Sequence, residues 1–260
     1  MLLRLIRNAT LLIDFAGSRL LIDPMLNPAG AVDPVSNTGN PRRNPLVELP
    51  VPAEEVLAGV DAVLVTHLHN DHFDALAGQL LPTDVLVLCQ PPDATRLVRR
   101  GFRDVRPVET RTEIHGITVV RTGGCHGTGE IGRQMGEVSG FVLRAPDEPA
   151  LYVVGDSIWC AEVEAALDEQ SPEVVVVNAG GARFLQGDHI VMDERDVITT
   201  ARAIPTATIV AVHLEALNHC PVSRTGLRAH VEAAGLGDRV RIPADGEALT
   251  SGHGFYVSHP

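Results

Sequence analysis

Short apolar runs alternate along the chain with segments whose apolar residues recur at helical spacing. The four consecutive valines at 174–177 are typical of a strand buried on both faces. We predict strands at residues 11–15, 19–23, 62–66, 85–89, 117–121, 140–143, 151–154, 174–178 and 208–212, and helices at 93–100, 158–168, 193–203 and 224–234. The first third of the chain is predicted to be a meander and the rest strand–helix–strand units. A layered α/β fold is therefore expected.

One segment interrupts this alternation. Seven of the 18 prolines lie between residues 24 and 52, together with Asn-Thr-Gly-Asn at 37–40. Because predicted strands flank the segment on both sides, we interpret it as a long irregular loop within a single domain spanning residues 1–260. Long ordered loops of this kind often serve as lids or binding loops, and a packed surface excursion is the alternative.

Composition and charge narrow the classes of protein. The chain has 260 residues, of which 45% are apolar and 21% charged, as expected for a globular protein. Its net charge of -12 argues against a general nucleic-acid binder. All 21 basic residues are arginines, which excludes mechanisms that need a lysine. The four cysteines are far apart and no apolar run is long enough for a membrane span, so a reduced cytoplasmic protein is expected.

The strongest chemical signal is the string H-L-H-N-D-H at 67–72, which directly follows the apolar run at 60–65. His67 and His69 alternate in an extended segment and therefore point to the same side. Asp71 and His72 follow where the chain turns, so they can face a neighbouring point. This pattern favours ligands for two metal ions, and a polar loop with surplus histidines is the alternative.

Three further candidates each follow a predicted strand: His126, Asp156 and His213. Binding residues of sheet proteins collect at strand ends, so these side chains are expected to meet the 67–72 string. Any one of them alone would more often be a cap or a satisfied polar group.

Together these residues resemble the metallo-β-lactamase fold superfamily over nearly the whole chain. The segments 9–13 and 20–24 look like its first hairpin. Within the superfamily, residues 188–194 and 209–213 are similar to the branch of the ascorbate-6-phosphate lactonase-like proteins and the phospholipase D that cleaves N-acyl phosphatidylethanolamines. The chain departs from that branch at 7–10, where Arg-Asn-Ala-Thr replaces Gly-His-Ala-Ser/Thr, and again at 213–221.

The resemblance implies a four-layer αββα sandwich with mixed sheets and the site at one edge. It implies one divalent ion on His67, His69 and His126, a second on Asp71, His72 and His213, and Asp156 as the bridge. Zn²⁺ suits these ligands, with Mn²⁺ and Fe²⁺ as alternatives. Asp23 either accepts a hydrogen bond from a ligand histidine or begins a turn before Pro24.

The implied activity is that of a metal-dependent hydrolase. A hydroxide shared by two ions would attack a carbonyl or phosphoryl centre of a small lactone, ester, amide or phosphodiester. We predict catalytic roles for Asp71, His189 and His219, the two histidines orienting substrate or protonating a leaving group. For His189 a plain helix-entry residue is the alternative.

Three other activities compete with this one. A nuclease or phosphodiesterase is disfavoured by the acidic charge. A diiron-type redox member of the same fold is disfavoured because His69 stands where those proteins typically have Glu. A non-catalytic metal protein is disfavoured because all seven ligand positions are filled. The expected partner is a small-molecule substrate, with no nucleic acid and no membrane span, and oligomeric state is left open.

Several remaining features receive plain interpretations. Arg42 and Arg43 in the proline-rich loop can meet an anion, although a solvated pair is favoured. Cys125 and Cys220 are read as inert thiols rather than pocket residues. The G-x-G-x-x-G string at 127–132 is interpreted as a flexible loop, because no amphipathic helix of useful length is predicted after it. Surface or tail positions are expected for His115, His230, His253 and His259.

Overall fold

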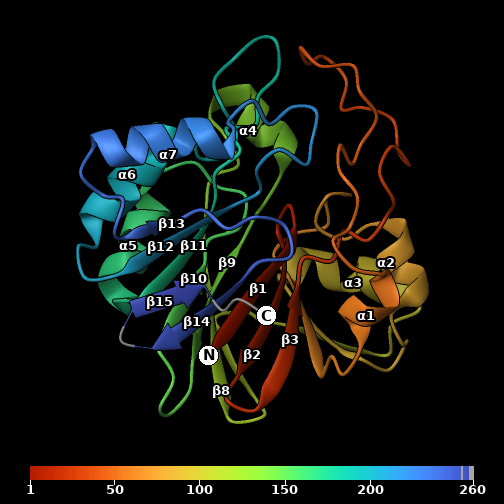
Figure 1. The fold of residues 1–260 in the computed structure, drawn as a ribbon. Coiled ribbons are helices and arrows are strands. Elements are labelled where there is room, and N and C mark those ends of the chain that lie inside the picture. Colours follow the sequence, from red (N-terminus) through yellow and green to blue (C-terminus); the bar gives the residue numbers. More distant parts are fainter. Residues whose placement is uncertain (253, 258–260) are drawn as a thin grey trace.

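Two mixed β-sheets pack face to face and helices cover both outer faces, which is the four-layer sandwich expected from the sequence (Figure 1). This architecture comes from a computed structural model that describes residues 1–252 and 254–257. Each predicted strand and helix is present within three residues of its predicted ends. His253 and His259 lie outside the described residues.

The first sheet has eight strands in the order β15-β14-β1-β2-β3-β4-β5-β6. Their bounds are β1 Leu2–Arg7, β2 Thr10–Phe15, β3 Ser18–Ile22, β4 Ala62–Val65, β5 Leu86–Cys89, β6 Asp104–Pro107, β14 Ala248–Gly252 and β15 Gly254–Val257. Strands β1 to β3 form an antiparallel meander, in which β1 was not predicted. Strands β3 to β6 are parallel, so the meander predicted for the first third of the chain ends at β3.

The second sheet has seven strands in the order β13-β12-β11-β10-β9-β8-β7. Their bounds are β7 Arg111–Ile114, β8 Ile117–Thr122, β9 Gly140–Arg144, β10 Leu151–Val153, β11 Val174–Asn178, β12 Thr208–Val212 and β13 Val240–Arg241. Strands β7 to β10 are antiparallel, so the prediction of strand–helix–strand units throughout this part was wrong. The reason is local: β7 and β8 are joined by His115 and Gly116, both at positive φ, in a hairpin turn too short for a helical crossover.

Helices cover the outer faces of both sheets. Helices α1 (Ala53–Leu57), α2 (Ala75–Leu80) and α3 (Pro91–Arg99) pack on the first sheet, and α5 (Ala161–Gln170), α6 (Glu194–Ala203) and α7 (Arg224–Ala233) on the second (Figure 1). Helix α4 (Gly129–Met135) lies at the upper edge of the view and buries none of its side chains. It begins inside the G-x-G-x-x-G string, so the prediction of a flexible loop there was wrong. No helix in the described part of the chain has the length and apolar character needed to cross a membrane.

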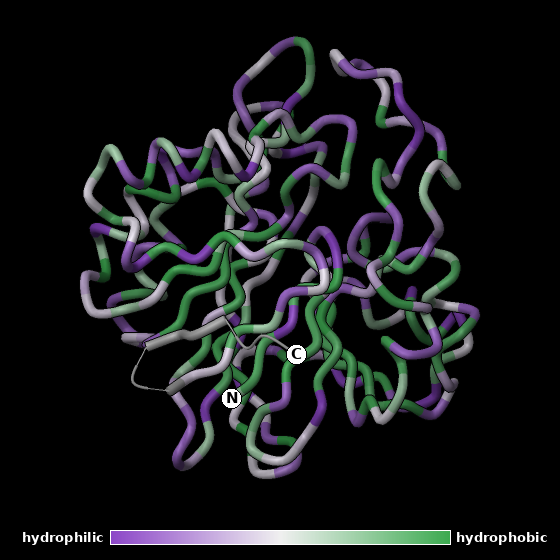
Figure 2. Tube along the Cα trace, viewed as in Figure 1, coloured by the Kyte–Doolittle hydropathy of each residue, from purple (hydrophilic) through white to green (hydrophobic). Residues whose placement is uncertain are grey.

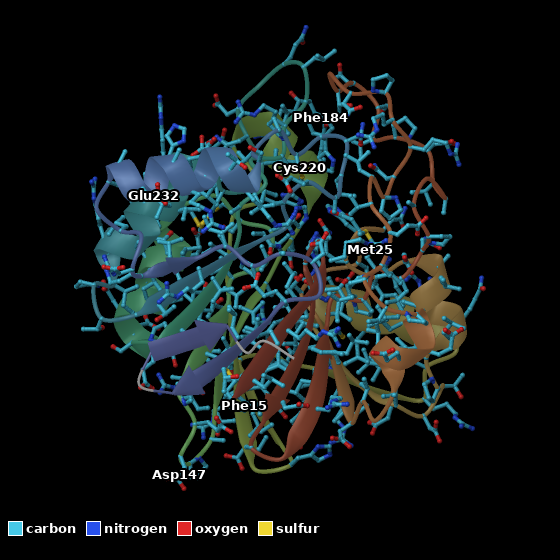
Figure 3. The ribbon with its side chains drawn as sticks, viewed as in Figure 1. Phe15, Met25, Asp147, Phe184, Cys220 and Glu232 are labelled. Carbon is cyan, nitrogen blue, oxygen red and sulfur yellow. The ribbon has the colours of Figure 1, made fainter. Side chains whose placement is uncertain are left out.

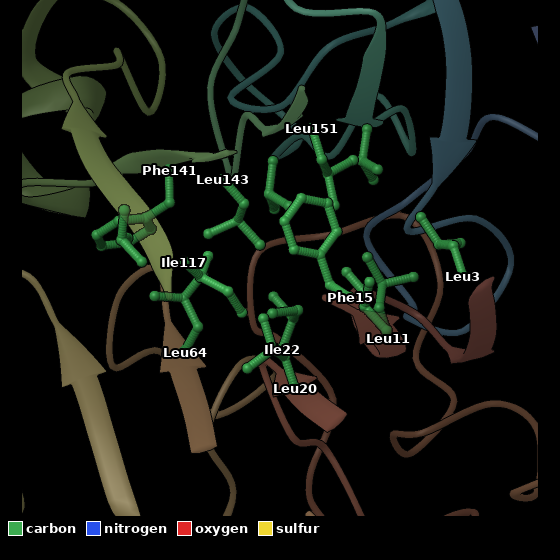
Figure 4. Packing of buried hydrophobic residues seen from close by; sticks show 14 of the residues in the cluster. Leu3, Leu11, Phe15, Leu20, Ile22, Leu64, Ile117, Phe141, Leu143 and Leu151 are labelled. Carbon is green, nitrogen blue, oxygen red and sulfur yellow. The ribbon is translucent and has the colours of Figure 1, made fainter. Parts of the chain in front are cut away.

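The main core fills the space between the two sheets. Phe15 and Ile22 from the first sheet meet Ile117, Phe141 and Leu151 from the second, and all of them are buried (Figure 4). The strands are the most apolar part of the trace, whereas purple hydrophilic segments gather in loops and on outer helix faces (Figure 2). Strand alternation thus places apolar side chains inside and leaves the strand ends to carry polar chemistry.

Candidate metal centre

The predicted ligands come together at the edge where several strands end. Residues 67–72 follow β4, His126 follows β8, Asp156 follows β10 and His213 follows β12. Strands β10, β11 and β12 are parallel, and β8 and β10 both pair antiparallel with β9, so these carboxyl ends share one edge. The structure therefore brings all seven predicted side chains together at this edge.

Two groups of ligand atoms form, as the resemblance implied. In the first, His67 Nε2 lies 3.0 Å from His69 Nδ1, which lies 3.3 Å from His126 Nε2. In the second, Asp71 Oδ2 lies 3.3 Å from His213 Nε2 and 3.6 Å from His72 Nε2. Within each group the ligand atoms are all within 4.8 Å of one another.

Asp156 stands between the two groups. Its Oδ2 is 3.5 Å from His126 Nε2 in the first group and 3.2 Å from His72 Nε2 in the second. The amide of Asn178 donates a 2.6 Å hydrogen bond to Asp156 Oδ1, which orients the carboxylate. Sequence reasoning missed Asn178, although it ends the buried valine run of β11 and carries the same strand-end signal as the ligands.

Two of the imidazoles form a hydrogen bond through Nδ1, which orients their Nε2 atoms toward the other predicted ligands. His72 Nδ1 donates to Asp23 Oδ2 at 2.8 Å, and His126 Nδ1 donates to the carbonyl of Ile190 at 2.8 Å. Asp23 also accepts from the backbone N–H and the hydroxyl of Thr66. Of the two interpretations of Asp23, the structure therefore supports the one in which it supports a ligand histidine.

The donor set fits two divalent cations. His72 Nε2 is buried and has no hydrogen-bond partner, although Asp156 Oδ2 lies 3.2 Å away. Since His72 Nδ1 carries the proton donated to Asp23, the neutral ring turns its Nε2 lone pair toward a carboxylate. A cation between the two atoms resolves that repulsion. Imidazole and carboxylate together are the ligands of zinc and related ions.

The electrostatics of the cluster suit metal binding as well. Burial lowers the pKa of His67 and of His126, which favours the neutral, ligating form of both rings. Burial disfavours the ionised form of Asp156. The electrostatic attraction of His72 and His213 is stronger than this effect and holds the pKa of Asp156 well below its usual value. Burial also opposes charge on His72 and on His213, yet the neighbouring acids raise the pKa of both. A metal ion would replace the protons held there.

The structure separates the two histidines predicted to act on substrate. His219 lines the space beside the ligands, and its Nδ1 is buried without a hydrogen-bond partner. His189 is not brought into the cluster: its Nε2 lies 2.8 Å from Asp196 Oδ2, at the start of α6. Asp196 also accepts a hydrogen bond from the backbone N–H of Trp159, so Asp196 links His189 to the segment that precedes α5.

Two adjoining cavities open onto the ligands. One, of about 400 Å³, is lined by His69, Asp71, His126, Asp156 and His219 among others. The second, of about 350 Å³, shares Asp71 and His219 with the first and extends toward the proline-rich loop. Its apolar lining comes from Met25, Val32, Val35, Pro45 and Leu217. Met25 and Cys220, both labelled in Figure 3, belong to one buried apolar cluster together with Leu217.

The proline-rich loop is irregular as predicted, and buried polar groups hold it over the cavity. The guanidinium of Arg7 is fully buried and donates to the carbonyls of Met25, Asn27 and Val47. From the far side, the amide of Asn218 exchanges hydrogen bonds with loop residues 35–44. Neither residue was singled out from the sequence, because a buried Arg and an isolated Asn leave no pattern there.

The departure from the expected Gly-His-Ala-Ser/Thr string has a structural role. Asn8, at the position of the missing histidine, adopts a positive φ of 58° in the turn between β1 and β2. Its amide donates to the carbonyl of Asp71, and its own carbonyl accepts from the N–H of His213. Asn8 therefore joins the loops that carry two of the predicted ligands.

Most of the other candidates behave as their plain interpretations suggest. Arg43 pairs with Asp33 and bonds the carbonyls of residues 30 and 31, and Arg42 bonds the carbonyl of Leu46. Both arginines thus bind their own loop. Arg96 of α3, which sequence reasoning did not identify, does line the 400 Å³ cavity. His115 and His230 are exposed.

Comparison with known proteins decides the family. The model of the beta-lactamase superfamily domain matches residues 18–214. The chain belongs to the beta-lactamase superfamily. The UPF0173 protein YddR of Bacillus subtilis is 39% identical over 248 residues, which cover 94% of this chain and 98% of that protein. A UPF0173 metal-dependent hydrolase of Azorhizobium caulinodans is 26% identical over 252 residues, or 93% and 96% of the two chains.

Solved structures agree with this assignment. An isothiocyanate hydrolase from Delia radicum gut bacteria has a TM-score of 0.92 and 38% identity, covering 99% of this chain and 100% of that one. A protein of Veillonella parvula described as a possible metal-dependent hydrolase has a TM-score of 0.93 and 35% identity, covering 96% and 99%. The chain is accordingly an enzyme, a metal-dependent hydrolase of the superfamily. The finer resemblance to the lactonase-like branch stays a prediction, since none of these relatives carries that name.

Proposed function

We propose that the chain hydrolyses small, uncharged electrophiles with two divalent metal ions, and that organic isothiocyanates are among its substrates. The observation that carries the proposal is the convergence of seven ligand side chains beside a largely apolar cavity. The similarity to an isothiocyanate hydrolase over the full length of both chains supports the choice of substrate.

Each ion would have its own ligands. His67, His69 and His126 would hold one, Asp71, His72 and His213 the other, and Asp156 would contact both. Two bound ions supply Lewis acidity and a nucleophilic water of lowered pKa. Zn²⁺ is the proposed metal, because neutral imidazoles with ionised carboxylates match its preferences.

The charge of the cavity favours an uncharged substrate. Apart from His219, the ionisable residues among those lining the 350 Å³ cavity are Asp33, which pairs with Arg43, and Asp71, which would bind an ion, so this lining offers no arginine to an anionic group. The apolar side chains of Met25, Val32 and Leu217 would take the organic group of R–N=C=S. Its central carbon would lie toward Asp71, next to the ligands. Addition of one water and cleavage of the C–N bond gives R–NH₂ and O=C=S.

Chain residues would orient the reactants. Asp71 lies in both cavity linings, so its carboxylate can accept a hydrogen bond from the attacking water. His219 also lies in both linings, and its imidazole can donate a proton to the departing nitrogen. Burial lowers the pKa of His219, which makes it a stronger proton donor whenever it is protonated.

The test is an activity panel on zinc-loaded protein with an alkyl isothiocyanate, a lactone, an ester, an amide and a phosphodiester. Isothiocyanate loss with amine release is expected from the wild type. His69→Ala and Asp156→Ala should lose this activity and retain fewer metal ions, while the exposed His115→Ala serves as the matched control. Loading should place about two ions in the cluster. A fully loaded protein that leaves the isothiocyanate intact and cleaves another bond type would refute the proposed substrate.

A further inference from the structure

A separate group of potential metal ligands, two thiols and a carboxylate, lies beside the loop that carries His126. The thiols of Cys125 and Cys160 and the carboxylate of Glu162 have ligand atoms that all lie within 4.8 Å of one another. Cys125 Sγ is 3.3 Å from Glu162 Oε2. Cys125 directly precedes the ligand His126, but successive side chains of an extended segment point to opposite sides. The thiol therefore faces α5, whereas the imidazole faces Asp156.

We propose that Cys125, Cys160 and Glu162 form a separate binding site for one thiophilic divalent cation such as Zn²⁺ or Cd²⁺. The site would be distinct from the His/Asp centre and would leave one coordination position open to water. Binding would displace the thiol protons to solvent, and no other bond would form or break.

The distances suit tetrahedral coordination. Zinc binds thiolate sulfur at about 2.3 Å and carboxylate oxygen at about 2.0–2.2 Å, so its ligand atoms sit roughly 3.5–3.8 Å apart. Cys125 Sγ lies 3.3 Å from Glu162 Oε2 and all three ligand atoms lie within 4.8 Å of one another, so small side-chain rotations reach that spacing without a change of fold. Thiolates select zinc and similar soft ions over magnesium or calcium.

The surrounding backbone is shaped to hold the three side chains together. A Cβ on Gly123 would come within 3.2 Å of Glu162 Cγ, so the glycine makes room for that side chain at the end of β8. The hydroxyl of Ser157 accepts from the N–H of Cys125 at 2.9 Å and lies 3.5 Å from Cys160 Sγ. Ser157 thus positions both cysteines.

Exposure and charge also permit a cation to enter. Cys125 and Cys160 are half-buried, and Glu162 is exposed, so the group opens to solvent. One divalent ion with two thiolates and a carboxylate carries a net charge of −1. Cys160 is the N-cap of α5, where the positive end of the helix dipole favours such an anionic complex. A bound ion would tie this helix end to the loop that carries His126.

The experiment titrates the reduced, metal-free protein with Cd²⁺ and follows the ultraviolet thiolate-to-cadmium charge-transfer band. Because the proposed His/Asp centre would take up to two ions without giving this band, the band is expected to reach its plateau by three equivalents of Cd²⁺ in the wild type. Cys160→Ser should lose it, and Glu162→Gln should need a higher Cd²⁺ concentration for the same band. Cys89→Ala is the matched control, because Cys89 is a buried thiol of β5 outside the site. His69→Ala should keep the band, which separates this site from the proposed catalytic centre.

Three results would overturn the proposal. The first is absence of the band in the reduced wild type. The second is its persistence in Cys160→Ser, which would assign the signal to another thiol such as Cys220. The third is a Cys125–Cys160 disulfide in protein purified without reductant, combined with no Cd²⁺ uptake after reduction.

Discussion

Replacing Asp23 with Asn tests whether the groups behind the ligands control metal affinity. Asp23 is 1% exposed and accepts a hydrogen bond from His72 Nδ1 at 2.8 Å and two from Thr66, at 2.8 and 2.7 Å. The Asn side chain keeps this shape but presents an N–H₂ group to His72 Nδ1. The imidazole proton must then move to Nε2, the atom that faces Asp156 and the predicted ion.

The expected loss follows from that change. Substituting a residue that supports a ligand histidine typically costs 10- to 100-fold in metal affinity, or about 1.4–2.8 kcal/mol. The free energy of unfolding should fall by about 1–3 kcal/mol, because Asp23→Asn disrupts a charged hydrogen bond in a buried site. One of the two ions, the one held with His72, should be affected more strongly than the other.

The assay is competition between the metal-free protein and a coloured chelator, with thermal unfolding measured in parallel. Asp74→Asn is the matched control. Asp74 is a buried carboxylate that accepts two backbone hydrogen bonds, from Ala77 and Asn27, and forms no hydrogen bond with a histidine in the described part of the chain. It should lose stability and keep its metal affinity. The reasoning is refuted if Asp23→Asn binds both ions as the wild type does, or if Asp74→Asn weakens binding equally.

Asn218→Ala removes hydrogen bonds that hold the proline-rich loop over the cavity, so it should lower the free energy of unfolding by about 1–3 kcal/mol. It should also raise KM for an isothiocyanate more than it lowers kcat. An unchanged KM in steady-state kinetics would contradict this. Arg96→Gln should raise KM about two- to fivefold for a carboxylate-bearing isothiocyanate and leave a neutral one unaffected, and equal effects on both would dismiss Arg96 as the anion contact. In the presence of a chelator that removes the metal ions, the midpoint temperature of thermal unfolding should be highest at pH ~6.5. The pKa values of His72 and His213 are raised in the folded protein, so the stability that they contribute is lost as the pH rises above the ordinary histidine pKa. The pKa of His67 is lowered in the folded protein, so His67 costs stability as the pH falls below that value. A midpoint that keeps rising toward alkaline pH would disprove that balance.

The residues of the candidate metal centre were predictable because local sequence pattern marks them. His126, Asp156 and His213 each stand directly after an apolar strand, and the carboxyl ends of those strands meet at one edge. The alternation of strands and helices predicted a layered α/β fold, and the resemblance to the metallo-β-lactamase superfamily implied its four layers. Missed elements such as β6 and β7 are short and half-exposed, so their residues lack the apolar run that identifies a buried strand.

The partners of polar side chains were decided only by tertiary structure. His189 carries the signals of a site residue, yet Asp196, seven positions later, binds its imidazole. Arg7 is a charged residue in a strand, and only the folded loop supplies the three carbonyls that make its burial tolerable. The alternation of apolar and polar residues along a chain indicates which face of a sheet or helix each residue occupies and where a strand ends. It carries no information on which distant loop will meet that end, because such contacts depend on how separate segments pack.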